Sequence, residues 1–142
     1  MNRDDYNRYL AAFNAKHYDG VADFYAEPIR MDFFGVAIRS RDDLKRFYSF
    51  LHSYVNESVT VRNFASSDTL TAVDAIVRIE AVRDLSAETL AAHGCAQFHP
   101  MTAGQIFELR QFIFYTIRDG KIEQVECAML PPEESVVQVT AK

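Results

Sequence analysis

The sequence predicts an α+β fold in which helices occupy the first third of the chain and long β-strands most of the rest. Between residues 6 and 17, and again between 44 and 55, apolar side chains recur every three or four positions, the spacing of one helix face. From Glu57 onward they recur at every second position, which is typical of strands. The 142 residues, of which 49% are hydrophobic, suit one domain with a real core. We therefore predict a single domain over residues 1–142, with helices packed against a sheet.

Two helices are predicted before residue 27. Asp4 or Asp5 can cap the first helix, which ends at the Asp-Gly pair of residues 19–20, where glycine permits a turn. A short second helix is expected over residues 21–26. It ends before Pro28, because the residue that precedes a proline is pushed out of α geometry.

A strand over residues 29–34 and a third helix complete the first third. Gly35 allows a turn after the strand. Ser40 is a good N-cap for the helix, and Asp43 stands at the acidic position of a capping box. The apolar stripe of this helix consists of Leu44, Phe47, Tyr48, Leu51 and Val55.

The rest of the sheet is predicted from the two-residue period. Val59, Val61 and Asn63 share one face of its first strand. The following strands are expected, in order, over residues 69–85, 105–118 and 121–130, with a turn at 66–68 and a hairpin turn at the Asp-Gly pair of 119–120.

Both faces of the two long strands carry apolar side chains. One face of the first consists of Val73, Ala75, Val77, Ile79 and Ala81, and one face of the second of Phe107, Leu109, Gln111, Ile113, Tyr115 and Ile117. We expect these faces to pack on the helices and line a cavity. The opposite faces, with Phe112 and Phe114, are expected to pair with a second subunit, which predicts a homodimer.

Two segments fall outside the regular pattern. Residues 86–104 are predicted to form a lid, with one or two helical turns over 87–92 that Gly94 stops. Residues 131–142 are predicted to leave the sheet as a C-terminal tail. Within it, residues 135–140 can form an edge strand, on this chain or on a neighbour.

Charge and cysteine content exclude several classes of partner. The net charge of −5 comes without a Lys/Arg cluster, so we expect no nucleic-acid or membrane partner. No run approaches the ~18 apolar residues of a membrane span, and the N-terminus is polar rather than signal-like, so a cytoplasmic location is expected. Cys95 and Cys127 are too few for a disulfide framework and fit a reducing compartment. We expect no cofactor and no metal, because His93, Cys95 and His99 match no common zinc spacing and lack a fourth ligand.

The segment RYLAAFNAKHYDGVADFYAEPIRMDFFG, residues 8–35, resembles the opening of the steroid Δ-isomerases, members of the nuclear-transport-factor-2-like and SnoaL-like superfamily. In that pattern one helix ends in A-x-N-x-x-x-x-D-G and the next in F-Y-A-E, after which a strand delivers an acid followed by a glycine. Here the acid is Asp32 and the glycine Gly35, with one deleted residue allowed near 27–29. The resemblance implies a cone-shaped fold in which three N-terminal helices pack on a curved, mixed or antiparallel sheet and enclose a pocket.

The same resemblance implies catalytic residues. Asp32 takes the place of the general base that moves a proton between carbons, and Tyr9 that of the hydroxyl that donates to the developing enolate oxygen. The isomerases place a second, protonated acid on the long strand near residues 111–113, where this chain has Gln111, Phe112 and Ile113, and an amide cannot share a proton in that way. We therefore predict a SnoaL-like isomerase, cyclase or dehydratase that acts by acid-base chemistry on a hydrophobic small molecule. A non-catalytic binding or protein-association module of the same fold is the alternative.

The pocket wall is predicted to be mainly aromatic and aliphatic, with Gln111 as a further donor. Its other members are Phe13, Phe24, Phe33, Phe47, Tyr48, Leu51, Phe107, Leu109, Tyr115 and Met129.

Ordinary structural roles compete with these assignments. A lone acid at a strand end usually caps a turn, and a tyrosine on an apolar helix face usually belongs to the core. The triplet Arg78-Ile79-Glu80 resembles the Arg-x-Asp of limonene epoxide hydrolases. We favour instead an ion pair between Arg78 and Glu80 on the sheet face that is expected to contact a second subunit. His17 and His52 are expected to be helix-face residues with ordinary partners.

Overall fold

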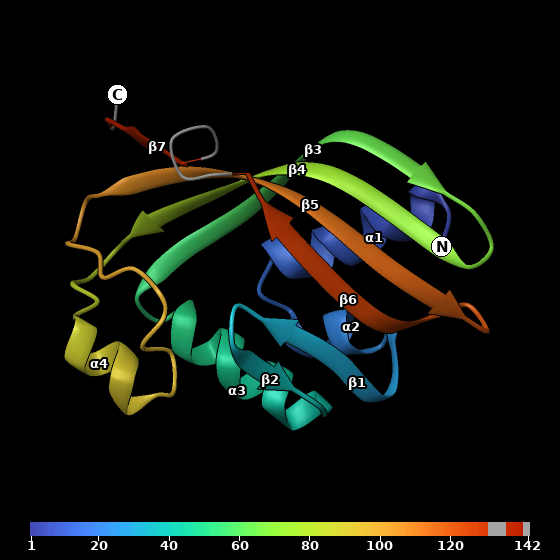
Figure 1. The fold of residues 1–142 in the computed structure, drawn as a ribbon, viewed down its shortest axis with the longest axis horizontal. Coiled ribbons are helices and arrows are strands. Elements are labelled where there is room, and N and C mark those ends of the chain that lie inside the picture. The colour runs from blue at the N-terminus through green and yellow to red at the C-terminus, as the bar shows by residue number, and fades with distance from the viewer. Residues whose placement is uncertain (131–135, 141–142) are drawn as a thin grey trace.

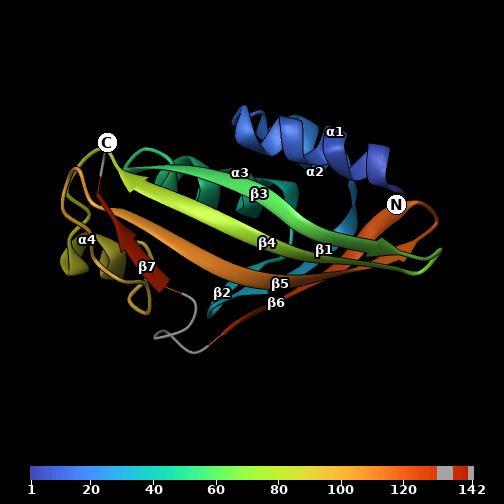
Figure 2. The ribbon, with the colours of Figure 1, turned by 90° about the horizontal axis from the view of Figure 1, so that it is seen from above.

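The computed structural model describes residues 1–130 and 136–140 and shows a strongly curved sheet with helices on one face (Figures 1 and 2). The helices are α1 (Arg3–Asn14), α2 (Tyr18–Ala22), α3 (Arg41–Leu51) and α4 (Ala87–Ala92). The strands are β1 (Tyr25–Phe33), β2 (Val36–Ile38), β3 (Val55–Ser66), β4 (Leu70–Ala81), β5 (Ile106–Arg118), β6 (Lys121–Met129) and β7 (Val136–Val139). The α+β cone predicted from the sequence is confirmed.

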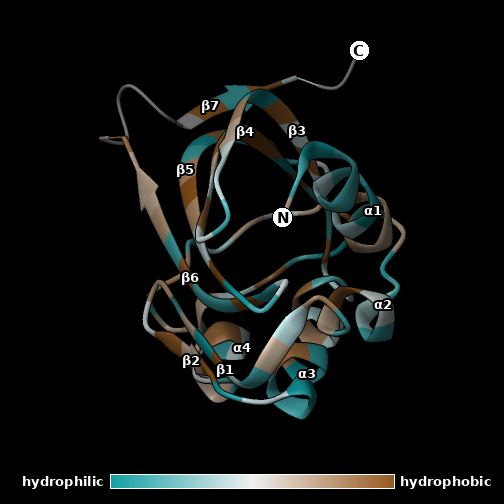
Figure 3. Cartoon of the chain, turned by 90° about the vertical axis from the view of Figure 1, so that its right-hand side faces the viewer, coloured by the Kyte–Doolittle hydropathy of each residue, from teal (hydrophilic) through white to brown (hydrophobic). Residues whose placement is uncertain are grey.

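The sheet is mixed. Its order is β2-β1-β6-β5-β4-β3, with β7 paired to β5. The β1–β6 pair is parallel, whereas the other pairs are antiparallel. Seen along the strands, the sheet bends around until α1 and α3 close its concave side (Figure 3). The cavity described below lies on this side.

The core fills the concave side as the strand periodicity predicts. Tyr6, Tyr9 and Phe13 of α1 are buried, and the buried residues of β5 include Gln111, Ile113, Tyr115 and Ile117. Phe114 points to the convex side and is 44% exposed. No described helix is both long and apolar enough to cross a membrane.

The first two helices differ from the prediction at their ends. Asn2, and neither Asp4 nor Asp5, caps α1, and Asp5 is the reciprocal partner in its capping box. Helix α2 begins at Tyr18 and ends at Ala22, so it does not reach Pro28. Pro28 instead lies within β1, at an irregularity in the pairing with β6, where a missing N–H breaks no regular ladder.

A bulge in β3 corrects a second prediction. The pairing with β4 shifts between Val61 and Asn63, so Asn63 lies opposite Asp74 and Phe64 opposite Val73. One extra residue moves every later side chain to the other face. Asn63 therefore does not share the row of Val61. It donates its amide to Asp74 at 2.9 Å, and Phe64 packs on the core.

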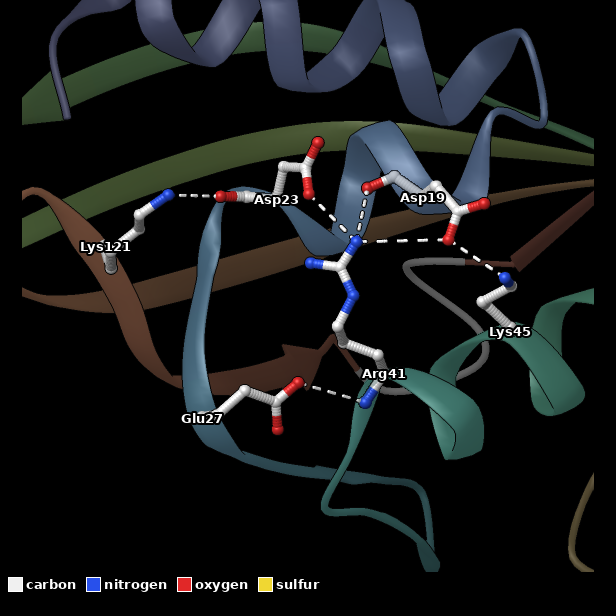
Figure 4. Close-up of polar contacts among 6 residues, drawn as sticks. All are labelled: Asp19, Asp23, Glu27, Arg41, Lys45 and Lys121. Carbon is white, nitrogen blue, oxygen red and sulfur yellow. Dashed lines mark hydrogen bonds and ion pairs between the residues drawn. The ribbon is translucent and has the colours of Figure 1, made fainter.

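Helix α3 begins as predicted, since the Ser40 hydroxyl accepts from the Asp43 backbone N–H at 3.1 Å. Its first turn joins α2 through surface ion pairs (Figure 4). Arg41 lies 2.9 Å from Asp23, and Lys45 lies 2.9 Å from Asp19. These side chains are mostly exposed, so solvent screens each pair, which adds little to the stability of the fold.

The 86–104 segment is held by buried side chains. Leu90 of α4 is fully buried, and Cys95 and Met101 are 2% and 8% exposed. Leu85 and Met101 exchange backbone hydrogen bonds as an isolated bridge. The expected helical turns over 87–92 are present. The function of the segment as a lid stays a prediction. It was expected because these residues fall outside the regular apolar pattern, whereas several of their side chains are in fact buried in the core.

The C-terminal tail falls partly outside the described residues, which exclude 131–135 and 141–142. Within the described part, β7 pairs antiparallel with β5 of the same chain, from Leu109 opposite Val136 to Ile106 opposite Val139. The expected edge strand is therefore present, and it is added to this chain's own sheet.

Candidate functional site

A buried cavity lies between the helices and the concave face of the sheet. It has a volume of about 40 Å³ and is lined from α1, α3 and strands β1, β3, β4, β5 and β6. Its walls are Tyr6, Tyr9, Leu10, Phe13, Tyr25, Met31, Phe33, Tyr48, Glu57, Val59, Val77, Gln111, Ile113, Tyr115, Val125 and Cys127. Because a single water needs roughly 10–15 Å³ on this measure, the space suits only a very small molecule in the present conformation.

Tyrosine hydroxyls form the first polar feature of the cavity. Tyr9 Oη lies 3.0 Å from Tyr25 Oη, and Tyr6 Oη lies 3.4 Å from Tyr115 Oη. Burial raises the pKa of Tyr9, and it raises the pKa values of Tyr25 and Tyr115 well above the usual range. These hydroxyls therefore stay protonated near neutral pH and serve as hydrogen-bond donors.

Glu57 is the one carboxylate among the described residues that line the cavity. Its side chain is 7% exposed, and Oε2 lies 2.9 Å from Nε2 of His52, whose side chain is 3% exposed. His52 Nδ1 lies in turn 2.8 Å from the Tyr18 hydroxyl. A buried acid held by an imidazole is the arrangement expected of a positioned base.

The local fold explains why Glu57 points inward. It lies on β3 between Val55 and Val59, in the row that faces the core, and pairs with Ile79 of β4. His52 is the C-cap of α3, four residues after Tyr48. We did not predict this pair from the sequence. Glu57 stands two residues before Val59 in the alternating apolar row, and this spacing could have indicated that its side chain points inward.

The charge of Glu57 acts on several neighbours. It adds to the effect of burial in raising the pKa of Tyr48 well above its ordinary value. Burial raises the pKa of Cys127 to about 12, and Glu57 adds to this too. Cys127 is therefore a neutral thiol, which argues against a nucleophilic role.

Lys16 stands beside the same residue. Its ammonium group donates to the Glu57 backbone carbonyl and lies 5.5 Å from the centre of the Phe13 ring. Burial lowers the pKa of Lys16, and the charge of Glu57 partly opposes that shift. A cation therefore lies close to the buried carboxylate.

Asp32 lies elsewhere. Met31 and Phe33 face the cavity, so Asp32 between them on β1 faces out, because side chains alternate along a strand. Its side chain is 70% exposed, and Oδ1 lies 2.7 Å from Nη2 of Arg39. Both residues line a separate surface groove of about 550 Å³. The prediction that Asp32 and Tyr9 open onto one cavity is wrong.

The structure places the residues of the predicted pocket wall in different surroundings. Tyr9, Phe13, Phe33, Tyr48, Gln111 and Tyr115 line the cavity. Phe24, Phe47, Leu51 and Phe107 belong to the surrounding apolar cluster and not to the cavity lining. Leu109 is absent from both the lining and that cluster. Met129, the last residue of β6, is 40% exposed, so this end of the strand lies outside the site.

The other residue groups singled out in the sequence make ordinary structural contacts. Arg78 pairs across the sheet with Glu108 at 3.3 Å, and not with Glu80 of its own strand. His93 stacks on Phe50, with ring centroids 3.9 Å apart. In the part of the chain that the structure describes, no three His, Cys, Asp or Glu side chains gather as metal ligands would.

Comparison with known structures shows the fold. A proposed polyketide cyclase from Silicibacter sp. has a TM-score of 0.72 and 22% identity, over 92% of this chain and 90% of that one. A SnoaL-like polyketide cyclase from Agrobacterium tumefaciens gives a TM-score of 0.69 at 14% identity, over 91% and 92% of the two chains. A Δ5-3-ketosteroid isomerase from Mycobacterium sp. gives a TM-score of 0.65 at 14% identity, over 94% of each chain.

Sequence comparison identifies the family. No functionally curated protein matches the chain at a significant level. The family model of the SnoaL-like domain matches residues 6–125. This range runs from the first turns of α1 into β6 and includes most of the residues that line the cavity. The chain therefore belongs to the SnoaL-like family.

Proposed function

We propose that this protein is an acid-base enzyme that enolises a small apolar carbonyl compound, as an isomerase, cyclase or dehydratase does, with Glu57 as the base. One observation carries the proposal: the Glu57 carboxylate is held in an apolar cavity that also contains protonated tyrosine hydroxyls. The fold, which the chain shares with a polyketide cyclase and a ketosteroid isomerase, supports this class of reaction.

The residues divide the reaction between them. Because His52 occupies Oε2 of Glu57, the other carboxylate oxygen takes a proton from the carbon next to the substrate carbonyl. The electron pair of that C–H bond moves into the carbonyl, whose oxygen becomes an enolate. In the Tyr9–Tyr25 pair one hydroxyl donates to the other, which leaves one hydrogen to donate to this oxygen. The proton then returns from Glu57 to the same or another carbon.

The size of the cavity restricts the substrate. Sites for drug-sized ligands measure about 300–1,000 Å³, far above the 40 Å³ found here. A large polycyclic molecule would need the walls to move apart. We therefore propose a small monocyclic or short-chain carbonyl compound as the substrate class.

Exchange of α-protons for deuterium tests this proposal without knowledge of the natural substrate. Cyclopentanone, cyclohexanone and 2-tetralone are incubated with the protein in D₂O, and the loss of the α-proton signal is followed by NMR. We expect protein-dependent exchange that is fastest for the smaller ketones. Glu57→Gln should lower the rate by about 100-fold or more, whereas Glu126→Gln, on the exposed side of β6, should leave it unchanged. Equal rates in the wild type and Glu57→Gln would contradict the proposal, as would no acceleration of any ketone.

We also propose that the convex face of the sheet pairs with a second copy of the chain. Phe114, Leu70 and Val137 are 44%, 41% and 56% exposed, and a contact between two copies would remove their apolar surface from water.

The two cysteines are free thiols, which supports the proposed cytoplasmic location.

A further inference from the structure

Gln111 brings a polar side chain into the apolar cavity without a hydrogen-bond partner. It is 4% exposed and lines the cavity from β5. No hydrogen bond joins its amide group to any residue that the structure describes. Every fully enclosed side-chain nitrogen and oxygen of the described residues does have a partner, so the Gln111 amide keeps access to the space of the cavity. A buried amide of this kind is destabilising unless a molecule in the cavity hydrogen-bonds to it.

The Gln111 amide enters the cavity at a different level of the sheet from the tyrosine hydroxyls. Gln111 precedes Tyr115 by four residues in the inward row of β5, which places their Cα atoms about 13 Å apart. The Tyr9 ring lies 5.8 Å from the Tyr115 ring and 6.2 Å from the Tyr25 ring, so these tyrosines form one cluster. If the Tyr9–Tyr25 pair receives the enolate oxygen, Gln111 is left for another part of the substrate.

The chemistry of an amide limits what that part of the substrate can be. An amide donates from its NH₂ group and accepts at its oxygen, so it pairs with a hydroxyl group or a carbonyl oxygen. A carboxylate is disfavoured, because Glu57 already brings a negative charge and none of the described lining residues is Lys or Arg. The group that suits Gln111 is therefore an uncharged oxygen.

The Tyr48 hydroxyl also lacks a hydrogen-bond partner among the residues described, but it lies near the base. The Tyr48 ring is 5.3 Å from the ring of His52, which holds Glu57. Burial and then the charge of Glu57 raise the pKa of Tyr48 well above its usual value. Tyr48 is therefore placed to contact the reacting end of the substrate, whereas Gln111 has no such neighbour.

We propose that Gln111 is a specificity-determining residue that hydrogen-bonds a second, uncharged oxygen of the substrate. The substrate class is then a small hydroxy ketone or diketone rather than a simple ketone. This inference rests on the proposed function for the chemistry at the first oxygen and adds a contact at the second. The contact itself can be measured with molecules that have no proton to exchange.

Two cyclohexanones of nearly equal size test this contact by proton exchange in D₂O. 4-Hydroxycyclohexanone carries the second oxygen, and 4-methylcyclohexanone carries a methyl group in its place. We expect the wild type to accelerate exchange of the hydroxy compound about tenfold more, because the methyl group leaves the amide unpaired. Gln111→Met keeps the length of the side chain and removes its hydrogen-bonding groups, so this preference should disappear or reverse. Tyr48→Phe is the control, which should slow both compounds and keep their ratio.

Binding of two alcohols gives a readout that involves no reaction. trans-Cyclohexane-1,4-diol has two oxygens and trans-4-methylcyclohexanol has one, and neither is a ketone with an exchangeable α-proton. In calorimetry we expect the wild type to bind the diol about tenfold more tightly. Gln111→Met should lose this preference, and Tyr48→Phe should keep it.

Three results would overturn the proposal. They are equal affinity of the wild type for the two alcohols, a preference that survives in Gln111→Met, as expected if the amide held only water, and a preference that is lost in Tyr48→Phe instead. Failure of the proposed function would look different. If no ketone exchanges protons, Glu57 is not the base, whereas the two alcohols still decide whether Gln111 binds a second oxygen.

Discussion

Replacing Leu90 by alanine tests whether residues 86–104 form part of the core or a loose cover. Leu90 is fully buried on α4 and belongs to the main apolar cluster. The change removes the equivalent of two to three buried methylene groups, at about 0.8 kcal/mol each, and leaves a cavity that adds to the loss. We expect the free energy of unfolding to fall by about 3 kcal/mol.

Urea denaturation followed by circular dichroism measures this change, with the slope of the transition expected to stay constant. Val82→Ala is the control, because it removes methyl groups from a side chain that is 55% exposed and lies outside the proposed subunit contact. It should cost less than about 1 kcal/mol. If Leu90→Ala costs no more than Val82→Ala, the segment does not contribute to the core as described, and its interpretation as a lid regains its support.

Three further predictions concern the two faces of the sheet. Arg110 and then Asn63 hold the pKa of Asp74 below its usual value, so this carboxylate stabilises the folded state above about pH 4 and loses that effect as the pH falls. The stability difference between wild type and Asp74→Asn in urea titrations should therefore shrink between about pH 4 and pH 2; a constant difference would exclude the linkage. Cys127, with its raised pKa, should react with iodoacetamide at pH 8 much more slowly in the folded protein than in urea; equal rates would contradict its place in the cavity wall. Phe114→Glu should convert a dimer at micromolar concentration to a monomer in sedimentation, and a wild-type monomer would refute the proposed pairing.

Much of the fold could be predicted because several of its features are determined by residues that are close together in the sequence. The Ser40 cap, the Asp119-Gly120 turn and the inward rows of β4 and β5 all appear where the sequence placed them. Each depends on neighbouring residues alone, either through a capping hydrogen bond, a positive φ or the alternation of side chains.

Two errors concern the face of a strand on which a side chain lies. The bulge in β3 reverses the direction of later side chains and moves Asn63 to the convex side. In β1 the buried residues Tyr25, Ile29 and Met31 keep one alternation across the irregular pairing with β6. Asp32 therefore faces out, although its neighbours in the sequence resemble an isomerase site.

The candidate site was missed for a related reason. Glu57 and His52 are only five residues apart, but one lies on a strand and the other at the end of a helix, so no single period relates them. Their contact depends on the turn between α3 and β3. Tyr9 was assigned through the resemblance to the isomerases, and it lies on the buried face of α1.

The most direct test of the central claim compares Glu57→Gln with Asp32→Asn in the ketone exchange assay. Both changes replace a carboxylate by an amide of the same size, one in the cavity and one in the exposed pair with Arg39. The structure predicts that Glu57→Gln loses about 100-fold or more of the protein-dependent rate and that Asp32→Asn retains it. The reverse result, with the rate lost in Asp32→Asn and kept in Glu57→Gln, would contradict the assignment of Glu57 as the base.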